Sequence, residues 1–182
     1  MRSGRCLGLA ATGLLLAFLV GLALSPTSVL EILEGHEGLV LVRLPIAPGQ
    51  AFTLSYTHSM YEAQVHEVYR FEPGQGLVLD SVVSSPAALE YYALTQATPL
   101  PGGMARASGL GRPLGEVRVR VEGIGRPRLI HDGREIPLEG LVAEGQAVRL
   151  RIARVPRALM GLPRGAGEST SAPQHFSTPA QQ

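Results

Sequence analysis

The sequence predicts an all-β protein, built as a single antiparallel β-sandwich or partly open barrel and preceded by one N-terminal transmembrane or signal helix. Short stretches alternate apolar and polar residues with the two-residue period of a strand. Glycines and prolines separate these stretches at a spacing typical of sandwiches and barrels. The single cysteine, Cys6, permits no intramolecular disulfide, so the hydrophobic core must hold the domain together.

Residues 1–30 are expected to form a signal anchor or a signal peptide. Arg2 and Arg5 precede an uncharged apolar run, Leu7–Leu24, which as a helix is just long enough to cross a bilayer core of about 30 Å. The arginines would stay in the cytoplasm, so the rest of the chain would be exported. The length of the run and the lack of a clean cleavage site favour an uncleaved, single-pass anchor in a bacterial cell membrane. Cleavage, which would release the domain into the periplasm, is the alternative.

The predicted exported domain covers residues 35–155, enough for one core and hardly for two. The alternation is clearest in Glu116–Glu122 and Ala147–Ala153, where aliphatic side chains share one face and arginines share the other. Asp132-Gly133 is a hairpin turn signal. Seven strands are expected: Leu39–Leu44, Phe52–Thr57, Val65–Phe71, Leu77–Val83, Glu116–Glu122, Arg128–His131 and Ala147–Ala153.

Three segments lack a clear strand period. Ala87–Ala97 fits a short helix or another strand, and both assignments stay open. Pro99–Pro113, rich in glycine and proline, predicts a loop or an exposed flap. Residues 156–182 are rich in Ser, Thr, Pro, Gln and Ala, which predicts a disordered C-terminal tail.

The charge balance argues against nucleic acid as a partner. The chain has no lysine, and its sixteen arginines are matched by fifteen acidic residues. A nucleic-acid-binding domain needs a concentrated basic face with stacking aromatics. We therefore expect no nucleic-acid partner, and we interpret the outward-facing arginines as solvated surface.

The segment Ser55–Phe71 places a histidine and a glutamate on faces that should otherwise be apolar. In the first strand one face carries Phe52, Leu54, Tyr56 and His58; in the second it carries Val65, Glu67, Tyr69 and Phe71. A hairpin closing around Tyr61–Ala63 would bring His58 near Glu67 across the two strands. A buried carboxylate needs a partner. The pair is interpreted first as a structural hydrogen bond or ion pair, then as a ligand or partner site, and last as a catalytic site.

Recognisable catalytic and cofactor chemistry is missing from the sequence, so we predict neither an enzyme nor a cofactor. His58 and Ser59 are adjacent on a strand and face opposite sides, which prevents the histidine from serving the serine as a base. A metal site could use His58, Glu67 and His66, but His66 and Glu67 also face opposite sides. Glu62 lies in the turn, and His36, His131 or Glu90 would have to arrive from elsewhere to complete the ligand set.

The motif His58-Ser59-Met60, followed after a spacer by Val65-His66-Glu67-Val68-Tyr69, resembles the bacterial domain-of-unknown-function 1850 family. His58, Ser59, Glu67 and Tyr69 match the family pattern position by position. Gln64 stands where the family often has proline, and Ser85–Tyr92 departs from the family's glycine-rich segment. The resemblance covers about Leu39–Val155.

This resemblance implies a partner and no reaction. It implies an accessory of a TAXI-type tripartite ATP-independent periplasmic (TRAP) transporter, whose partners would be the membrane or solute-binding components of that transporter. Our leading hypothesis is a non-enzymatic, membrane-anchored accessory domain, with His58, Ser59, Glu67 and Tyr69 as its candidate polar site. The alternatives are a small-ligand or metal-binding module that uses His58 and Glu67, and an enzyme with an unrecognised site.

Overall fold

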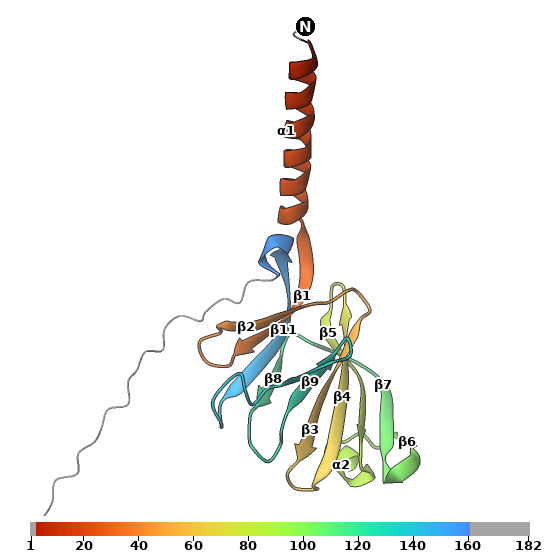
Figure 1. Cartoon of the computed structure of the whole chain (residues 1–182). Coiled ribbons are helices and arrows are strands. Elements are labelled where there is room, and N and C mark those ends of the chain that lie inside the picture. Colours follow the sequence, from red (N-terminus) through yellow and green to blue (C-terminus); the bar gives the residue numbers. More distant parts are fainter. Residues whose placement is uncertain (1–2, 161–182) are drawn as a thin grey trace, which may run out of the picture.

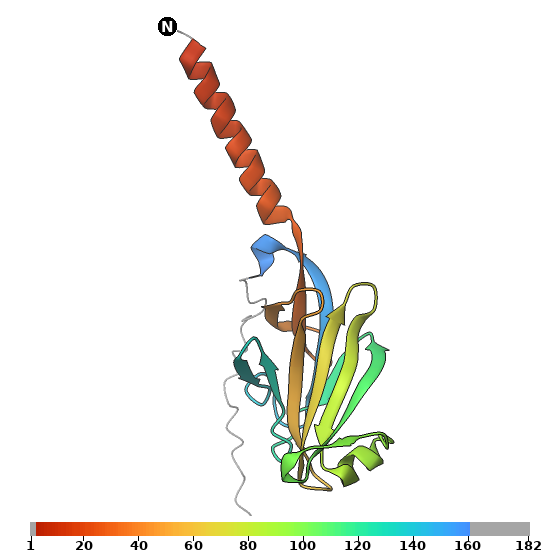
Figure 2. The same cartoon turned by 90° about the vertical axis from the view of Figure 1, so that its right-hand side faces the viewer.

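The computed structural model describes residues 3–160, with side chains described from residue 13 onward. Two antiparallel β-sheets pack against each other, and helix α1 (Ser3–Leu24) projects from one end of this sandwich (Figure 1, Figure 2). The predicted all-β class and the predicted N-terminal helix are both confirmed. In the part of the chain whose side chains are described, no helix is long and apolar enough to cross a membrane.

The smaller sheet has four strands and joins the two ends of the domain. Its order is β2–β1–β11–β8, so the strand that follows α1 lies beside the last strand of the domain. The pairing runs the full length of β1, from Pro26 opposite Pro156 to Glu34 opposite Val148. The strands are β1 (Pro26–Glu34), β2 (Val40–Pro45), β8 (Val117–Arg120) and β11 (Ala147–Pro156).

The larger sheet has seven strands in the order β10–β9–β3–β4–β5–β7–β6. A short helix, α2 (Pro86–Tyr91), follows β5 and lies at the end of the molecule away from α1 (Figure 1). The strands are β3 (Ala51–His58), β4 (Ala63–Glu72), β5 (Gly76–Ser84), β6 (Thr98–Pro99), β7 (Ala105–Leu114), β9 (Arg128–His131) and β10 (Arg134–Pro137). Two 3₁₀ turns complete the described chain, η1 (Pro101–Gly103) and η2 (Arg157–Leu159).

The main core lies between the two sheets, as the alternation in the strands predicts. Inward side chains of β8 and β11 pack against inward side chains of β3, β4 and β9, while the arginines between them face outward. Fully buried members include Leu30, Ile32, Phe52, Leu129, Val148 and Leu150. Burial of this apolar surface is the main source of stability in a domain with no disulfide.

A second, smaller cluster lies under α2. Leu89 of α2 packs with Val65, Val82 and Ala105 of the seven-stranded sheet. Tyr56 is packed against both this cluster and the main core. The same sheet is therefore covered by the four-stranded sheet over one part and by α2 over another, and Tyr56 marks the boundary between the two.

The structure corrects several predicted boundaries. Strand β1 adds residues 26–34 to the predicted domain and overlaps the predicted signal segment. It lacks alternation because both of its faces are buried: Val29 through Leu33 are at most 2 % exposed. The predicted flap Pro99–Pro113 contains the second residue of β6, η1 and most of β7. Gly109 and Gly111 of β7 adopt positive φ where the pairing with β5 shifts register.

The remaining ambiguous segments are also resolved in part. Ala87–Ala97 begins as a helix, α2, whose N-cap is Ser85: the Ser85 side chain accepts a hydrogen bond from the Ala88 backbone N–H. Strand β10, which the sequence did not suggest, forms a hairpin with β9 across the predicted Asp132-Gly133 turn. Of the predicted tail, residues 161–182 lie outside the described residues. In the part of the tail that is described, η2 occupies Arg157–Leu159.

Candidate functional site

The register of the β3–β4 hairpin separates His58 from Glu67. Glu67 lies opposite Leu54, and His58 lies opposite Ala63. The connecting turn is Ser59–Glu62, with Glu62 at φ +46°, and not the predicted Tyr61–Ala63. The four residue steps from Leu54 to His58 span about 13 Å of strand. The predicted contact between His58 and Glu67 was therefore wrong, although both residues occupy the predicted faces.

Two tyrosine hydroxyls bind the Glu67 carboxylate instead. Tyr56 donates a hydrogen bond to Oε1 at 2.9 Å, and Tyr69 donates to Oε2 at 2.6 Å. The Tyr92 hydroxyl of the chain segment following α2 lies 3.0 Å from that of Tyr56. Because the Tyr56 proton points to Glu67, Tyr92 acts as donor to Tyr56. The hydrogen bonds thus run from Tyr92 through Tyr56 to Glu67, with Tyr69 on the other oxygen.

The environment keeps these phenols protonated. Burial, and after it the negative charge of Glu67, raises the pKa of Tyr56 and of Tyr69 well above the usual value for tyrosine. Burial also raises the pKa of Tyr92. Tyrosines in this state donate hydrogen bonds at every physiological pH. Glu67 is consequently an acceptor that is fixed in place from two sides.

No cationic side chain accompanies Glu67. Among the residues with described side chains, no Arg or His nitrogen lies within ion-pair distance of its carboxylate. The contrast is Glu31, which is 2 % exposed and pairs with Arg43 and Arg151, each at 2.9 Å. Arginines neutralise the charge of Glu31 within the fold, whereas the Glu67 carboxylate is bound only by uncharged phenol donors.

His58 lies within a cluster of tyrosine rings. Its imidazole is 5.2 Å from the ring of Tyr61, 5.3 Å from Tyr91 and 5.7 Å from Tyr92, measured between centroids. Its Nδ1 atom is buried and has no hydrogen-bond partner in the described structure. Ser59 follows in the exposed turn. The His58 side chain thus joins the hairpin to α2.

His66 does not join this site. It lies on the opposite face of β4, opposite Ser55 of β3 and Val83 of β5. Burial, and then the nearby Arg128, lowers its pKa. Among the residues with described side chains, no group of three or more His, Cys, Asp or Glu converges as a metal site would require. The structure therefore does not bring together His58, Glu67 and His66, the three possible metal ligands in the sequence.

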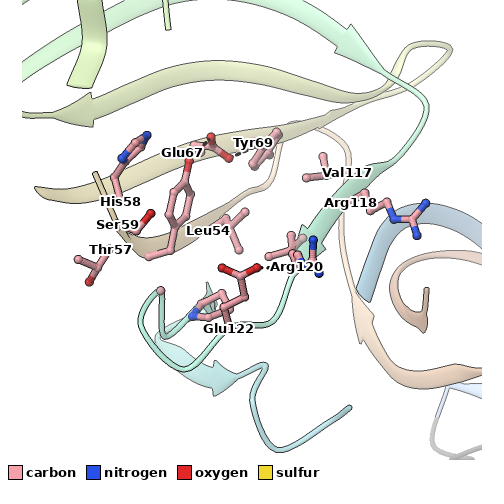
Figure 3. Close-up of a pocket in the computed structure, with 14 residues that line it drawn as sticks. Leu54, Thr57, His58, Ser59, Glu67, Tyr69, Val117, Arg118, Arg120 and Glu122 are labelled. Atoms are coloured by element: carbon pink, nitrogen blue, oxygen red, sulfur yellow. Dashed lines mark hydrogen bonds and ion pairs between the residues drawn. The ribbon is translucent and has the colours of Figure 1, made fainter. Parts of the chain in front are cut away.

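A pocket of about 370 Å³ opens beside Glu67 (Figure 3). All four residues of the predicted polar site, His58, Ser59, Glu67 and Tyr69, are among its lining residues. Leu54, Tyr56, Val117, Val119 and Pro127 supply apolar wall. The side across from β3 is formed by β8, the edge strand of the smaller sheet, and by the loop after β8, which is held to β3 by a 2.7 Å hydrogen bond from the Thr57 N–H to the Gly125 carbonyl.

Charged side chains stand at the outer side of the pocket. Arg118, Arg120 and Glu122 line it from β8 and the following loop. Arg120 and Glu122 form an ion pair at 3.0 Å, and both are mostly exposed (Figure 3). The pocket therefore combines a fixed carboxylate, apolar walls and a charged outer side, a composition typical of sites for small polar molecules.

The sequence did not reveal the tyrosines that hold Glu67, nor the contribution of β8. Tyr56 and Tyr69 were placed on the same face as Glu67, so a correct register would have identified them as its partners. Tyr92 and the residues of β8 and its loop arrive from distant parts of the chain. No local pattern in the sequence indicates that they meet the hairpin.

Comparison with known proteins gives one family model that matches part of the chain. No curated protein and no solved structure matches the chain. Residues 52–138, which include β3, β4, β8 and every lining residue of the pocket, match the family model Domain of unknown function (DUF1850). This match supports the family that the His58–Tyr69 motif resembles.

Proposed function

We propose that the chain is a non-enzymatic, exported accessory domain of a TAXI-type TRAP transporter, attached to or targeted to the bacterial cell membrane by its N-terminal apolar segment. The observation that carries this proposal is the presence of exposed apolar surfaces at opposite ends of one sandwich. One end carries α1, and the other carries the β3–β4 turn and α2 (Figure 1).

The α1 end favours contact with a membrane or with the export machinery. From Leu14 to Leu24 the large apolar side chains are strongly exposed, with Leu14 at 74 % and Phe18 at 68 %. The main contact of α1 with the rest of the described structure is with the turn η2, which follows β11. A helix that is apolar all round and packs against little protein requires an apolar environment from elsewhere. The basic residues Arg2 and Arg5 would orient it with the domain outside the cytoplasm.

The distal end favours contact with a protein partner. Outside α1, the large apolar residues exposed in the described structure are Leu39 and four distal residues: Met60, Tyr61, Tyr91 and Ile124. We call these four residues the distal tip. They come from the β3–β4 turn, α2 and the loop after β8, and the Tyr61 and Tyr91 rings are 5.9 Å apart. Exposed large apolar side chains, including a pair of aromatic rings in contact, are typical of protein interfaces.

Affinity purification tests this proposal. The tagged full chain, extracted from the membranes of its own cells in a mild detergent, should co-purify with a membrane or solute-binding component of a TAXI-type transporter. Ile124→Ser combined with Met60→Ser should reduce that recovery, because both side chains are exposed and contribute to the tip.

Leu39→Ser provides the matched control. Leu39 is also an exposed large apolar residue, at 50 %, but it lies outside the distal tip. Its substitution should leave the recovery of the transporter unchanged. The proposal fails if no transport component co-purifies with the unaltered chain, or if the tip and control variants behave alike.

A further inference from the structure

Glu67 combines three properties that a structural glutamate does not need. Its carboxylate is fixed by two phenol donors, it borders a pocket, and it has no cationic partner in the described structure. A negative charge held in partly apolar surroundings without a counter-charge is costly. Glu31, a buried glutamate of the same protein, is paired with two arginines. Glu67 has no arginine partner in the described structure, although Arg118 and Arg120 line the same pocket.

We propose that this pocket binds a small organic molecule through a protonated amino group, which pairs with the Glu67 carboxylate. The site is independent of the transporter contact proposed above, because the pocket is formed within one chain. An ammonium group supplies the missing positive charge together with N–H donors. A carboxylate offers about four acceptor positions, and the two phenols use two of them, so acceptor capacity remains for the ligand.

The shape and lining of the pocket limit the ligand. A volume of about 370 Å³ lies at the lower end of the range for small-molecule sites, roughly 300–1,000 Å³. Leu54, Val117 and Val119 provide apolar contacts for a compact hydrocarbon body. The Tyr56 ring adds an aromatic surface, which favours cations. The ligand should therefore be a compact amine with an apolar body.

An inorganic cation fits the same residues poorly. Calcium requires six to eight oxygen ligands, and zinc requires three or four protein ligands. Glu67 is a single carboxylate, and the hydroxyls beside it use their protons to bind it. The described part of the chain holds no cluster of three or more metal-binding side chains. An organic ammonium needs only the one anion and the apolar walls.

Arg118 and Arg120 decide between two kinds of amine. Both line the outer side of the pocket, and Arg120 is already paired with Glu122. A simple amine carries no group that would pair with these arginines. An amino acid would carry its carboxylate toward the Arg118 side. Both ligands share the ammonium group, and the experiment separates them.

The test is an NMR titration of the full chain in detergent with ligands that share a phenyl-alkyl body. Phenethylammonium carries the cation, 2-phenylethanol is its neutral counterpart, 3-phenylpropionate is the anion, and phenylalanine is the zwitterion. Phenethylammonium, phenylalanine or both should bind with saturable shifts, at least about 10-fold more tightly than the alcohol and the anion. Phenylalanine as the tighter ligand would identify amino acids as the ligand source; phenethylammonium as the tighter ligand would identify simple amines.

Glu67→Gln should weaken binding of the cation by about 10- to 100-fold, because it removes the charge and keeps the size of the side chain. Glu72→Gln is the matched control, since Glu72 lies on the same strand, pairs with Arg70 and does not line the pocket. Equal affinity for the cation and its neutral counterpart would overturn the proposal, and this comparison needs no variant to fold. Unchanged affinity in a folded Glu67→Gln protein, or shifts with calcium or zinc alone, would overturn it as well.

Discussion

Glu31 owes its partners to strand register. It lies in the middle of β1, directly opposite Arg43 of β2 on one side and Arg151 of β11 on the other. Arg43 is itself only 8 % exposed, so the ion pair is largely removed from water. Burial alone would raise the pKa of Glu31, but the hydrogen bonds from Arg43 and Arg151 outweigh it and lower the pKa. The charged form of Glu31 is therefore part of the folded state.

Glu31→Gln should destabilise the protein by about 3 kcal/mol, because it leaves the buried Arg43 guanidinium without a counter-charge. Urea unfolding at neutral pH measures this loss. Glu116→Gln is the control: its partner Arg149 is 3.5 Å away, and the two side chains are 46 % and 26 % exposed, far more than Glu31 and Arg43. That variant should cost less than about 1 kcal/mol. Similar losses in the two variants would show that the Glu31 pair is not buried in solution.

His66 should make stability depend on pH in the weakly acidic range. Burial, and then Arg128, lowers its pKa in the folded protein below the usual value of 6.5. The unfolded chain then takes up a proton first, so stability is lost as pH falls from about 6.5 toward the folded pKa. The contribution of Glu31 is lost only at lower pH, as its carboxyl becomes protonated below 4.5.

Replacing His66 isolates this effect. His66→Gln should flatten the stability profile between about pH 7.5 and about pH 5.5, while the unaltered chain loses stability over that interval. Unfolding by urea at the two pH values provides the comparison. An equally steep profile in the variant would assign the pH dependence to another group.

At the scale of elements, the sequence predicts faces better than registers. The two-residue period placed Tyr56, Glu67 and Tyr69 on one face, as the structure has them. Register depends on the turn, and the Ser59–Glu62 turn is not signalled because Glu62 is not a residue type typical of positive φ. The alternation of apolar and polar residues also fails to predict two other kinds of strand. These are strands that pair irregularly, such as β7, and strands that are buried on both faces, such as β1.

Helix α2 should contribute more to stability than its six residues suggest. Leu89 is 1 % exposed and packs with Val65, Val82 and Ala105. Leu89→Ala should cost about 2–4 kcal/mol, because it leaves a cavity between the helix and the sheet. Glu90→Ala, an exposed neighbour on the same helix, should change the free energy of unfolding by no more than about 0.5 kcal/mol.

Leu89→Ala should also change the packing of the tyrosine rings around His58. Tyr91 and Tyr92 follow on the same segment, and their rings contact His58. A loosened helix should therefore alter the tyrosine signals in near-ultraviolet circular dichroism, whereas Glu90→Ala should not. An unaltered tyrosine spectrum in the Leu89→Ala protein would show that the ring cluster is held by the hairpin alone.

At the scale of the whole molecule, the region that matches the family model is not the whole folding unit. Residues 52–138 begin at the second residue of β3 and continue through β10, but β1, β2 and β11 lie outside. Of the smaller sheet, only the edge strand β8 falls within the match. The excluded strands supply Leu30, Ile32, Val148 and Leu150 to the main core, and each of these is fully buried. The site is thus contained in a region that depends on both ends of the domain for its core.

Two fragments test this dependence. Residues 26–160 hold both sheets and both apolar clusters, so this fragment should fold cooperatively and keep the near-ultraviolet signal of the tyrosine cluster. Residues 52–138 should not fold, because the inner face of the larger sheet would lose most of its cover and β8 would lose its partner β11. Circular dichroism with thermal unfolding distinguishes the outcomes. If residues 52–138 unfolded cooperatively with the tyrosine signal intact, β1 and β11 would be an addition to an independent domain, and the pocket would belong to the larger sheet and β8 alone.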